Sequence, residues 1–346
     1  TEIPLDGDCP DWVMPNAGGT GYWRFSTDSG NLSALIANFD SLSAGEQVMF
    51  ADALTSGFRA GRISTDDLLA GLAATTRGHP SAVSNGTAII PTLDRMLDPA
   101  EKANLRAWVQ RTYGPLAQYL ESRPATALGQ REQLLRDKLY GLLLEYGERP
   151  AERHALLARA RLYVGEAGNA DSSALAPEDL AVAMGVGIED GGKRFYEATM
   201  AYLATVTNQS ERATILGTLA SRGDDEMVEN LFQDVLDGAY STDEAYRVVR
   251  SAMANVDAQD TAWAELTANF GTIVDRLPEI RKPVIAGVAG NFCSVRDAST
   301  AKAFFEDHAA LIPGHERSLA QGVERATLCS ALRTQKALDV KNAFQQ

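Results

Sequence analysis

Short helix-start signatures recur along this sequence at nearly constant spacing. Asn208, Asp224, Ser241 and Asp257 open successive helical stretches, and the intervals between them are 16, 17 and 16 residues. Helix pairs therefore repeat about every 33 residues, a period within the range of α-solenoid proteins. Because each short pair can bury its apolar stripe only against its neighbours, the pattern predicts a curved stack of antiparallel helix pairs.

Polar caps and glycines mark where the predicted helices begin and end. A capping side chain followed three residues later by a carboxylate satisfies free N–H groups and favours the helix dipole. Such pairs are Ser43 with Glu46, Asp98 with Glu101, Asn208 with Glu211, and Ser241 with Glu244. Helix ends are expected at Gly61, Gly147, Gly223 and Gly238. The sequence predicts an all-α fold, an α-solenoid of the HEAT or armadillo type; an irregular helical bundle is the alternative.

Residues 1–28 differ in kind from the rest of the chain. The stretch CPDWVMPNAGGTGYWRFSTD combines Pro, Gly and Asn with a short aromatic run, which predicts two short β-strands joined by a Gly-rich turn. Two strands alone are marginal in water. We therefore expect residues 1–28 to be the end of a β-sandwich domain and its connection, and residues 29–346 to be the helical solenoid domain.

Residues 165–192 form the least regular internal stretch of the sequence. Their Gly, Asp and Ser content predicts a long connection with one short helix near Pro177, so we expect a break between two helical subarrays there. The sequence begins at Thr1 rather than Met. We expect that a preceding part of the protein exists.

The charge of the chain argues against two classes of partner. The 346 residues carry a formal net charge of −14, which opposes the phosphates of nucleic acids and the headgroups of anionic membranes. No apolar run approaches the roughly 18 residues that a membrane span requires, so no membrane insertion is expected. With 45% hydrophobic residues the chain can bury a sizeable core.

Catalytic and metal-binding motifs are missing from the sequence. None of the four histidines has a second histidine four residues away, and HERSL at 315–319 has Leu319 where the zinc motif HExxH needs its second ligand. His315 is therefore expected to be an exposed residue at a helix start. No GxSxG, P-loop or dinucleotide motif occurs. We predict no catalytic residue, no metal ligand and no cofactor in this chain.

Two cysteines flank a predicted helical hairpin. One helix is expected over about 295–311 and a return helix from about 315, which brings Cys293 and Cys329 to the same level. A disulfide there would restrict the unfolded chain by roughly 3–4 kcal/mol and would imply an oxidising compartment. Two buried thiols are the alternative. Cys9 is left without a partner.

Three arginines recur on the last predicted helix. Arg317, Arg325 and Arg333 are eight residues apart, and one hypothesis is that they line a groove that receives a peptide carboxylate. A solvated helix face with ordinary ion pairs is the alternative.

Several segments resemble the M1 family of zinc aminopeptidases. NAGGTGYWRFSTD at 16–28 is similar to the family segment N-x-x-x-x-GYYRVNYD, with Trp23 in place of the second Tyr and Phe25-Ser26-Thr27 in place of Val-Asn-Tyr. GEQVMFADALTSGFRAGRIS at 45–64 looks like the next helix of that family. Residues 211–238 resemble its solenoid repeat, and residues 262–278 resemble its W-x-F segment.

The resemblance implies a non-catalytic C-terminal helical domain of an aminopeptidase of the aminopeptidase N or puromycin-sensitive type. Such a domain forms the wall of the substrate chamber and gates peptide access, while the parent enzyme removes N-terminal residues from peptides. The HExxH and GAMEN motifs have no counterpart here, so zinc is expected in a missing catalytic domain. A stand-alone α-solenoid interaction scaffold is the alternative.

The same resemblance implies partners and a compartment. The catalytic domain, the β-sandwich domain and a peptide substrate are the expected partners, with Tyr22 and Arg24 in the interdomain segment. The span from Cys293 to Cys329 matches a disulfide of some secreted and membrane-anchored members, which implies an extracytoplasmic location.

Overall fold

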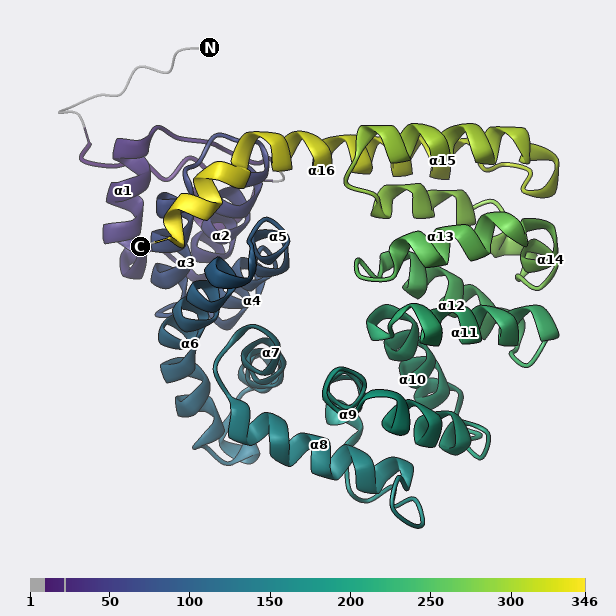
Figure 1. The fold of residues 1–346 in the computed structure, drawn as a ribbon. Coiled ribbons are helices and arrows are strands. Elements are labelled where there is room, and N and C mark those ends of the chain that lie inside the picture. Colours follow the sequence, from purple (N-terminus) through teal and green to yellow (C-terminus); the bar gives the residue numbers. More distant parts are fainter. Residues whose placement is uncertain (1–9, 22, 346) are drawn as a thin grey trace. The chain divides into compact units, whose positions relative to one another are not determined.

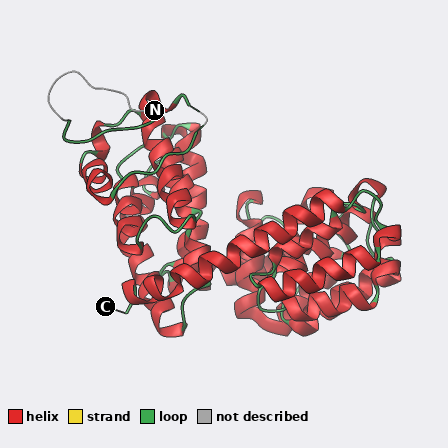
Figure 2. Cartoon of the chain, turned by 90° about the horizontal axis from the view of Figure 1, so that it is seen from above, coloured by secondary structure: helices red, strands yellow, loops and turns green. Residues whose placement is uncertain are grey.

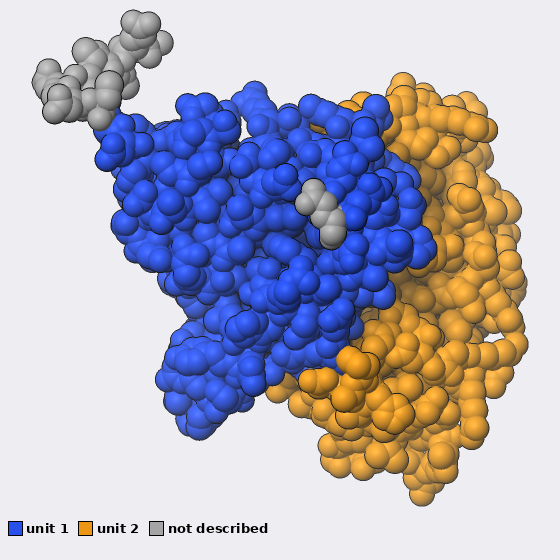
Figure 3. All heavy atoms as spheres, turned by 60° about the vertical axis from the view of Figure 1, so that its left-hand side comes forward, with its two compact units in different colours: residues 1–149, 332–346 blue, residues 150–331 orange. Residues whose placement is uncertain are grey.

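A computed structural model of the chain describes residues 10–21 and 23–345. Throughout these residues the regular structure is helical, with 16 α-helices, several short 3-10 turns and no strand (Figures 1 and 2). The all-α prediction is therefore confirmed. The chain divides into two compact units, drawn in different colours in Figure 3: Thr1–Arg149 with Leu332–Gln346 is unit 1, and Pro150–Ala331 is unit 2.

Unit 1 is built around helix α2. This helix packs against α3 and α4, α4 also packs against α7, and α7 packs against α6. The rings of Phe39 and Phe50 meet edge to face in the core, with 5.5 Å between their centroids. The helices of unit 1 are α1 (Ser29–Ala37), α2 (Ala44–Arg59), α3 (Thr65–Thr75), α4 (Pro80–Thr87), α5 (Ile90–Asp94), α6 (Pro99–Glu121), α7 (Gln130–Tyr146) and the last part of α16 (Glu316–Ala343).

The end of the chain completes the core of unit 1. Leu332, Val340 and Phe344 are buried in the same apolar cluster as residues of α2, α3 and α6. The Asp339 carboxylate accepts a hydrogen bond from the Thr65 backbone N–H at 3.1 Å, at the N-terminus of α3. Segments more than 250 residues apart in the sequence therefore share one core.

Unit 2 consists of helices that pack on their sequence neighbours. Helix α10 packs against α9 and α12, while α11 packs against α12 and α13, so consecutive helix pairs stack. Stacking hides the apolar stripe that each short helix carries. The helices of unit 2 are α8 (Pro150–Val164), α9 (Leu180–Leu203), α10 (Gln209–Arg222), α11 (Asp225–Asp237), α12 (Thr242–Ala254), α13 (Gln259–Ala268), α14 (Phe270–Asp275), α15 (Val295–Asp307) and the first part of α16.

The predicted helix caps are present, with one exception. Capping boxes start at Ser43, Asp98 and Ser241, and Asn208 caps α10 by accepting from the N–H groups of Ser210 and Glu211. Gly238 ends α11 in the left-handed conformation that favours glycine. Asp257 does not cap a helix, because α13 begins at Gln259 after Ala258.

Polar side chains link neighbouring helices of unit 2. The Arg212 guanidinium on α10 bonds to the Glu244 carboxylate on α12 at 2.5 Å. The buried Asn255 amide, after α12, donates to the Gly223 carbonyl at the end of α10 at 2.7 Å. These bonds set the spacing between helix pairs in addition to apolar packing.

The expected N-terminal β-strands do not occur in the described residues of 1–28. Residues 10–21 and 23–28, hereafter the N-terminal segment, contain one 3-10 turn, η1 (Ala17–Gly19), and otherwise extended or irregular backbone. The backbone groups of Val13 bond to the Asn31 side chain, at 2.7 Å through N–H and 3.0 Å through C=O, rather than to another strand. A β-strand needs a second strand to pair with. Here a side chain of helix α1 forms the hydrogen bonds that a neighbouring strand would form with Val13.

The Gly-rich stretch 165–192 lies inside unit 2, whose bounds are Pro150 and Ala331, and a break between helical subarrays at this stretch stays a prediction. A loop follows Gly165, and the expected short helix begins near Pro177: the 3-10 turn η4 (Pro177–Asp179) leads into α9 at Leu180, and α9 is interrupted at Gly192, whose φ of 61° is not helical. Gly187 and Gly191 lie against the Phe195 ring, so that a side chain at either position would collide with it. Glycine permits close packing at these two positions, whereas Gly192 interrupts the helix.

Candidate functional site

The N-terminal segment is held on α2 by hydrogen bonds. The Gly18 N–H donates to the Glu46 carboxylate at 2.8 Å, and Glu46 also closes the capping box with Ser43. These donors, Gly18 first and then Ser43, lower the pKa of the Glu46 carboxyl below its usual 4.5. The N-terminus of helix α2 therefore holds the N-terminal segment in place.

One of the two predicted interdomain residues is paired with α2. The Arg24 guanidinium bonds to the Asp52 carboxylate at 3.0 Å and is largely exposed. Tyr22 lies outside the described residues. Further along, the Arg62 guanidinium donates to the Ser26 hydroxyl at 3.0 Å, which fixes the end of the segment.

The N-terminal segment exposes two large apolar side chains. Val13 is 46% exposed and Trp23 is 50% exposed, and the Trp23 ring meets the Phe25 ring edge to face. The resemblance to an interdomain connection predicted a role for this segment, but not for the side chains of Val13 and Trp23. The aromatic run from Tyr22 to Phe25 is the sequence feature that could have indicated exposed apolar side chains here.

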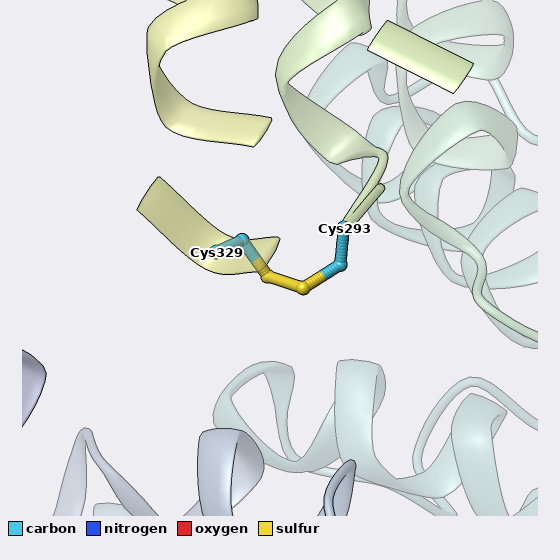
Figure 4. Close-up of a disulfide and its surroundings, with 2 residues drawn as sticks. All are labelled: Cys293 and Cys329. Atoms are coloured by element: carbon cyan, nitrogen blue, oxygen red, sulfur yellow. A yellow bond between two sulfur atoms is a disulfide. The ribbon is translucent and has the colours of Figure 1, made fainter. Parts of the chain in front are cut away.

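The two cysteines of the predicted hairpin form a disulfide. Cys293 precedes α15 and Cys329 lies in α16, and their Cα atoms are 5.1 Å apart (Figure 4). An aromatic cluster packs beside this hairpin: the rings of Trp263 and Phe270 each contact Phe304 and Phe305 edge to face. The hairpin is therefore held by a covalent bond and an aromatic cluster.

The three arginines of α16 do not share one helix face. A helix turns by about 100° per residue, so a step of eight residues rotates the side chain by about 80°. Arg325 donates to the Gly287 carbonyl at 2.8 Å, a contact within unit 2. Arg317 and Arg333 are exposed and lie in different units. A peptide groove formed by the three residues stays a prediction.

His315 occupies a structural position. It is buried, with 5% of its surface exposed, and its Nδ1 lies 3.2 Å from the Ile312 carbonyl oxygen, so the expectation of an exposed histidine is wrong. Leu319, one turn further on, is also buried. Across residues 10–21 and 23–345, no group of three or more His, Cys, Asp or Glu side chains is placed to hold a metal ion.

Unit 2 contains a cavity of about 390 Å³ on one side of α8. The loop after α8 forms its other wall and is fixed by the Glu166 carboxylate, which bonds to Arg161 at 3.1 Å and to Arg194 at 3.4 Å. This cavity was not predicted from the sequence. The sequence feature that could have indicated it is the four-residue spacing of three lining residues on α8, His154, Ala158 and Leu162.

A shared carboxylate joins helices α8, α9 and α10. The hydroxyls of Tyr163 on α8 and Tyr202 on α9 both donate to one oxygen of Glu211 on α10, each at 2.6 Å. Burial first, and then the bond to Glu211, raises the pKa of the Tyr163 phenol. The cluster holds both tyrosines protonated as hydrogen-bond donors, which is a structural role.

Comparison with known proteins identifies the chain. The family model described as "ERAP1-like C-terminal domain" matches residues 12–328. No curated protein matches the chain. None of the helices in the described ranges has the length and hydrophobicity that crossing a membrane would require. Because the family model spans most of the 346 residues, this chain belongs to the ERAP1-like C-terminal domain family, the C-terminal domain of M1 aminopeptidases.

Proposed function

We propose that this chain is the non-catalytic part of a zinc aminopeptidase that removes N-terminal residues from peptides. In that role its helices form part of the wall of the substrate chamber and limit entry to short peptides or free chain ends. The observation that carries the proposal is the family match over residues 12–328. Stacked helix pairs of the kind seen in unit 2 suit such a wall, because they present a continuous packed surface.

The chemistry in this proposal belongs to another part of the parent protein. A catalytic zinc site keeps three protein ligands and an open position for water. The sequence of this chain contains no HExxH motif, so the zinc would be held by the catalytic domain. The contribution of the present domain is to position peptides and control their access and release.

The N-terminal segment would connect the domain to the preceding β-sandwich domain. Exposed apolar side chains at Val13 and Trp23 support this part of the proposal, since large apolar groups on a surface are typical of contact regions. The bonds from Gly18 to Glu46 and from Arg24 to Asp52 would transmit the position of that domain to α2.

The proposed location of the parent protein is extracytoplasmic. The Cys293–Cys329 disulfide supports it, because structural disulfides persist mainly in oxidising compartments.

A peptidase assay tests the proposal. The 346-residue chain is incubated with an alanine-anilide substrate and added zinc, next to the parent protein and to the parent protein without residues 29–346. We expect no turnover by the isolated chain, turnover by the parent, and altered peptide-length selectivity in the shortened parent. Turnover by the isolated chain would contradict the proposal. A start codon just upstream of Thr1, without a preceding HExxH region, would favour an independent interaction scaffold.

A further inference from the structure

The cavity beside α8 is lined by residues of unit 2 alone. Its volume of about 390 Å³ lies in the range of small-molecule sites and equals the space of about thirteen water molecules. Leu157, Ala158, Leu162 and Ala167 line it with carbon, and Arg161 contributes a positive charge. The described residues include no aspartate or glutamate in this lining, although the whole chain carries a net charge of −14.

The loop after α8, which forms the outer wall, is fixed to the helix. The N–H groups of Gly165 and Asp171 both donate to the Leu162 carbonyl, at 3.2 and 3.1 Å. Gly165 has a φ of 75°, and a Cβ there would lie 2.7 Å from a backbone nitrogen of the loop, so this turn requires glycine. The Arg159 guanidinium also donates to the Ala174 carbonyl at 2.9 Å. The cavity is therefore preformed.

Four backbone donors of this loop are already bonded. The N–H groups of Gly165, Glu166, Gly168 and Asp171 donate within the loop or back to α8. Extended peptides are recognised largely through backbone hydrogen bonds to an open edge. Recognition in this cavity therefore depends on side chains, which favours a small ligand over a peptide.

Arg161 is the charged group that faces the cavity. Its Nε lies 3.1 Å from the Glu166 carboxylate, and its side chain is 43% exposed. Glu166 is almost completely buried, does not line the cavity, and also pairs with Arg194 at 3.4 Å. One carboxylate between two guanidinium groups leaves a net positive charge. Among the described residues, none accepts a hydrogen bond from the terminal Nη groups of Arg161, so these donors remain for a ligand.

We propose that this cavity binds a small carboxylate with an unbranched apolar chain, of the size of octanoate. The terminal N–H groups of Arg161 bind the carboxylate, since a guanidinium matches its geometry. Leu157, Leu162 and Ala167 shield the chain from water. Octanoate has about ten non-hydrogen atoms, which a cavity with room for about thirteen waters accommodates. This site goes beyond the proposed function, because it needs neither a peptide nor the parent enzyme.

Saturation-transfer NMR with octanoate tests the site on the full chain. We expect saturable binding with a dissociation constant of about 1 mM or lower, which about ten non-hydrogen atoms can supply. Octan-1-ol has the chain without the charge, and acetate has the charge without the chain. Each should bind about tenfold more weakly than octanoate or worse, because each loses one of the two contributions.

Two arginine variants test the role of the charge. Arg161→Gln and Arg194→Gln each remove one partner of Glu166, but only Arg161 lines the cavity. Arg161→Gln should weaken octanoate binding about tenfold or more, as expected when a hydrogen bond to a charged group is lost. Arg194→Gln should keep the wild-type affinity.

Two phenylalanine variants test the place of binding. Ala158→Phe fills the cavity from α8 without changing any charge, and Ala155→Phe is the matched control at an exposed position outside the lining. Ala158→Phe should abolish octanoate binding, whereas Ala155→Phe should retain it. Circular dichroism checks that all variants fold. Ala158→Phe leaves the pairing of Arg161 with Glu166 intact, so it tests the site even if Arg161→Gln disturbs the loop.

Several results would overturn the site. These are no binding of octanoate up to about 10 mM, equal affinity of octan-1-ol and octanoate, equal affinity of the two arginine variants, and undiminished binding by Ala158→Phe. Peptidase activity does not enter the measurement. An empty cavity therefore leaves the proposed function standing, and turnover by the isolated chain would reject that function without touching the cavity.

Discussion

Asn255 shows how a single buried side chain fixes the spacing of two helix pairs. Its amide nitrogen donates to the carbonyls of Gly223 at 2.7 Å and Ala220 at 3.3 Å, and its oxygen accepts from the Asp257 N–H at 3.2 Å. All of these groups belong to helix ends or turns, where the backbone lacks helical partners. The side chain therefore replaces hydrogen bonds that the chain itself cannot supply.

Replacing Asn255 with Ala should destabilise unit 2. The two carbonyls would remain buried without a donor, which costs about 1–3 kcal/mol. Urea unfolding followed by circular dichroism measures the change in the free energy of unfolding. Asn230→Ala, an exposed position on α11, is the matched control and should change it by less than about 0.5 kcal/mol. An equal change in the free energy of unfolding for both variants would show that the Asn255 side chain does not hold the two helix pairs together.

Glu46 should make stability depend on pH. Because its pKa is lowered in the folded chain, the ionised carboxylate stabilises the fold above its unfolded value of about 4.5. That contribution is lost as the pH falls through the lower folded pKa. Glu46→Gln should therefore reduce stability by about 0.3–1 kcal/mol at pH 7, as expected for a charge at a helix N-terminus.

At acidic pH the Glu46→Gln variant and the wild type should converge. Urea midpoints at pH 7 and at a pH below the folded pKa measure this difference directly. A variant with the same deficit at both values would show that the carboxylate charge plays no part. Glu229→Gln on an exposed face of α11 serves as the control substitution.

At the scale of the element, the α15–α16 hairpin is fixed by its disulfide. The bond joins residues 36 apart and links the loop before α15 to the middle of α16. The apolar contacts of this hairpin are partly aromatic, since Phe305 and Phe270 are almost completely buried. Covalent and apolar contributions act on the same two helices.

Removal of the disulfide should lower the stability of unit 2 by about 3–4 kcal/mol in the loop-entropy account. The variant Cys293→Ser with Cys329→Ser is compared with wild type under oxidising and reducing conditions. We expect the variant to match reduced wild type, and intact mass with a thiol label should report one disulfide in oxidised wild type. A variant as stable as the oxidised wild type would contradict the expected contribution.

At the scale of the whole molecule, residues at the C-terminal end of the chain are part of the hydrophobic core formed by the N-terminal helices. Leu332, Val340 and Phe344 are buried with residues of α2, α3 and α6, and the Asn104 amide donates to the Phe344 carbonyl at 2.7 Å. Unit 1 is thus incomplete until residues 332–345 are in place. Unit 2, in contrast, is built from consecutive helices.

Deleting residues 332–346 should unfold or loosen unit 1 and spare unit 2. The deletion exposes the apolar core of unit 1 to water, whereas the helices α9 to α13 keep their neighbours. Hydrogen exchange with mass spectrometry should show lost protection in α3 and α6 and retained protection in α10 and α12. Deleting Gln345 and Gln346 alone is the control, and equal loss of protection in both units would contradict a division into two cores.

The sequence alone was sufficient for features that depend on neighbouring residues. Helix caps such as Ser43 and Ser241 and the terminating Gly238 act within one turn, so their pattern predicts helices directly. The disulfide could also be predicted, because the lengths of two antiparallel helices bring Cys293 and Cys329 to the same height along the hairpin. The prediction of N-terminal strands was wrong for the described residues of 1–28.

Only the tertiary structure decided the features that depend on distant partners. Val13 bonds to Asn31 instead of another strand, and Gly187 makes room for Phe195, neither of which local propensity reveals. The return of residues 332–345 to unit 1 and the cavity beside α8 are likewise set by packing between segments. The physical reason is that short-range backbone preferences are encoded residue by residue, whereas burial is a property of the surfaces that the folded chain brings together.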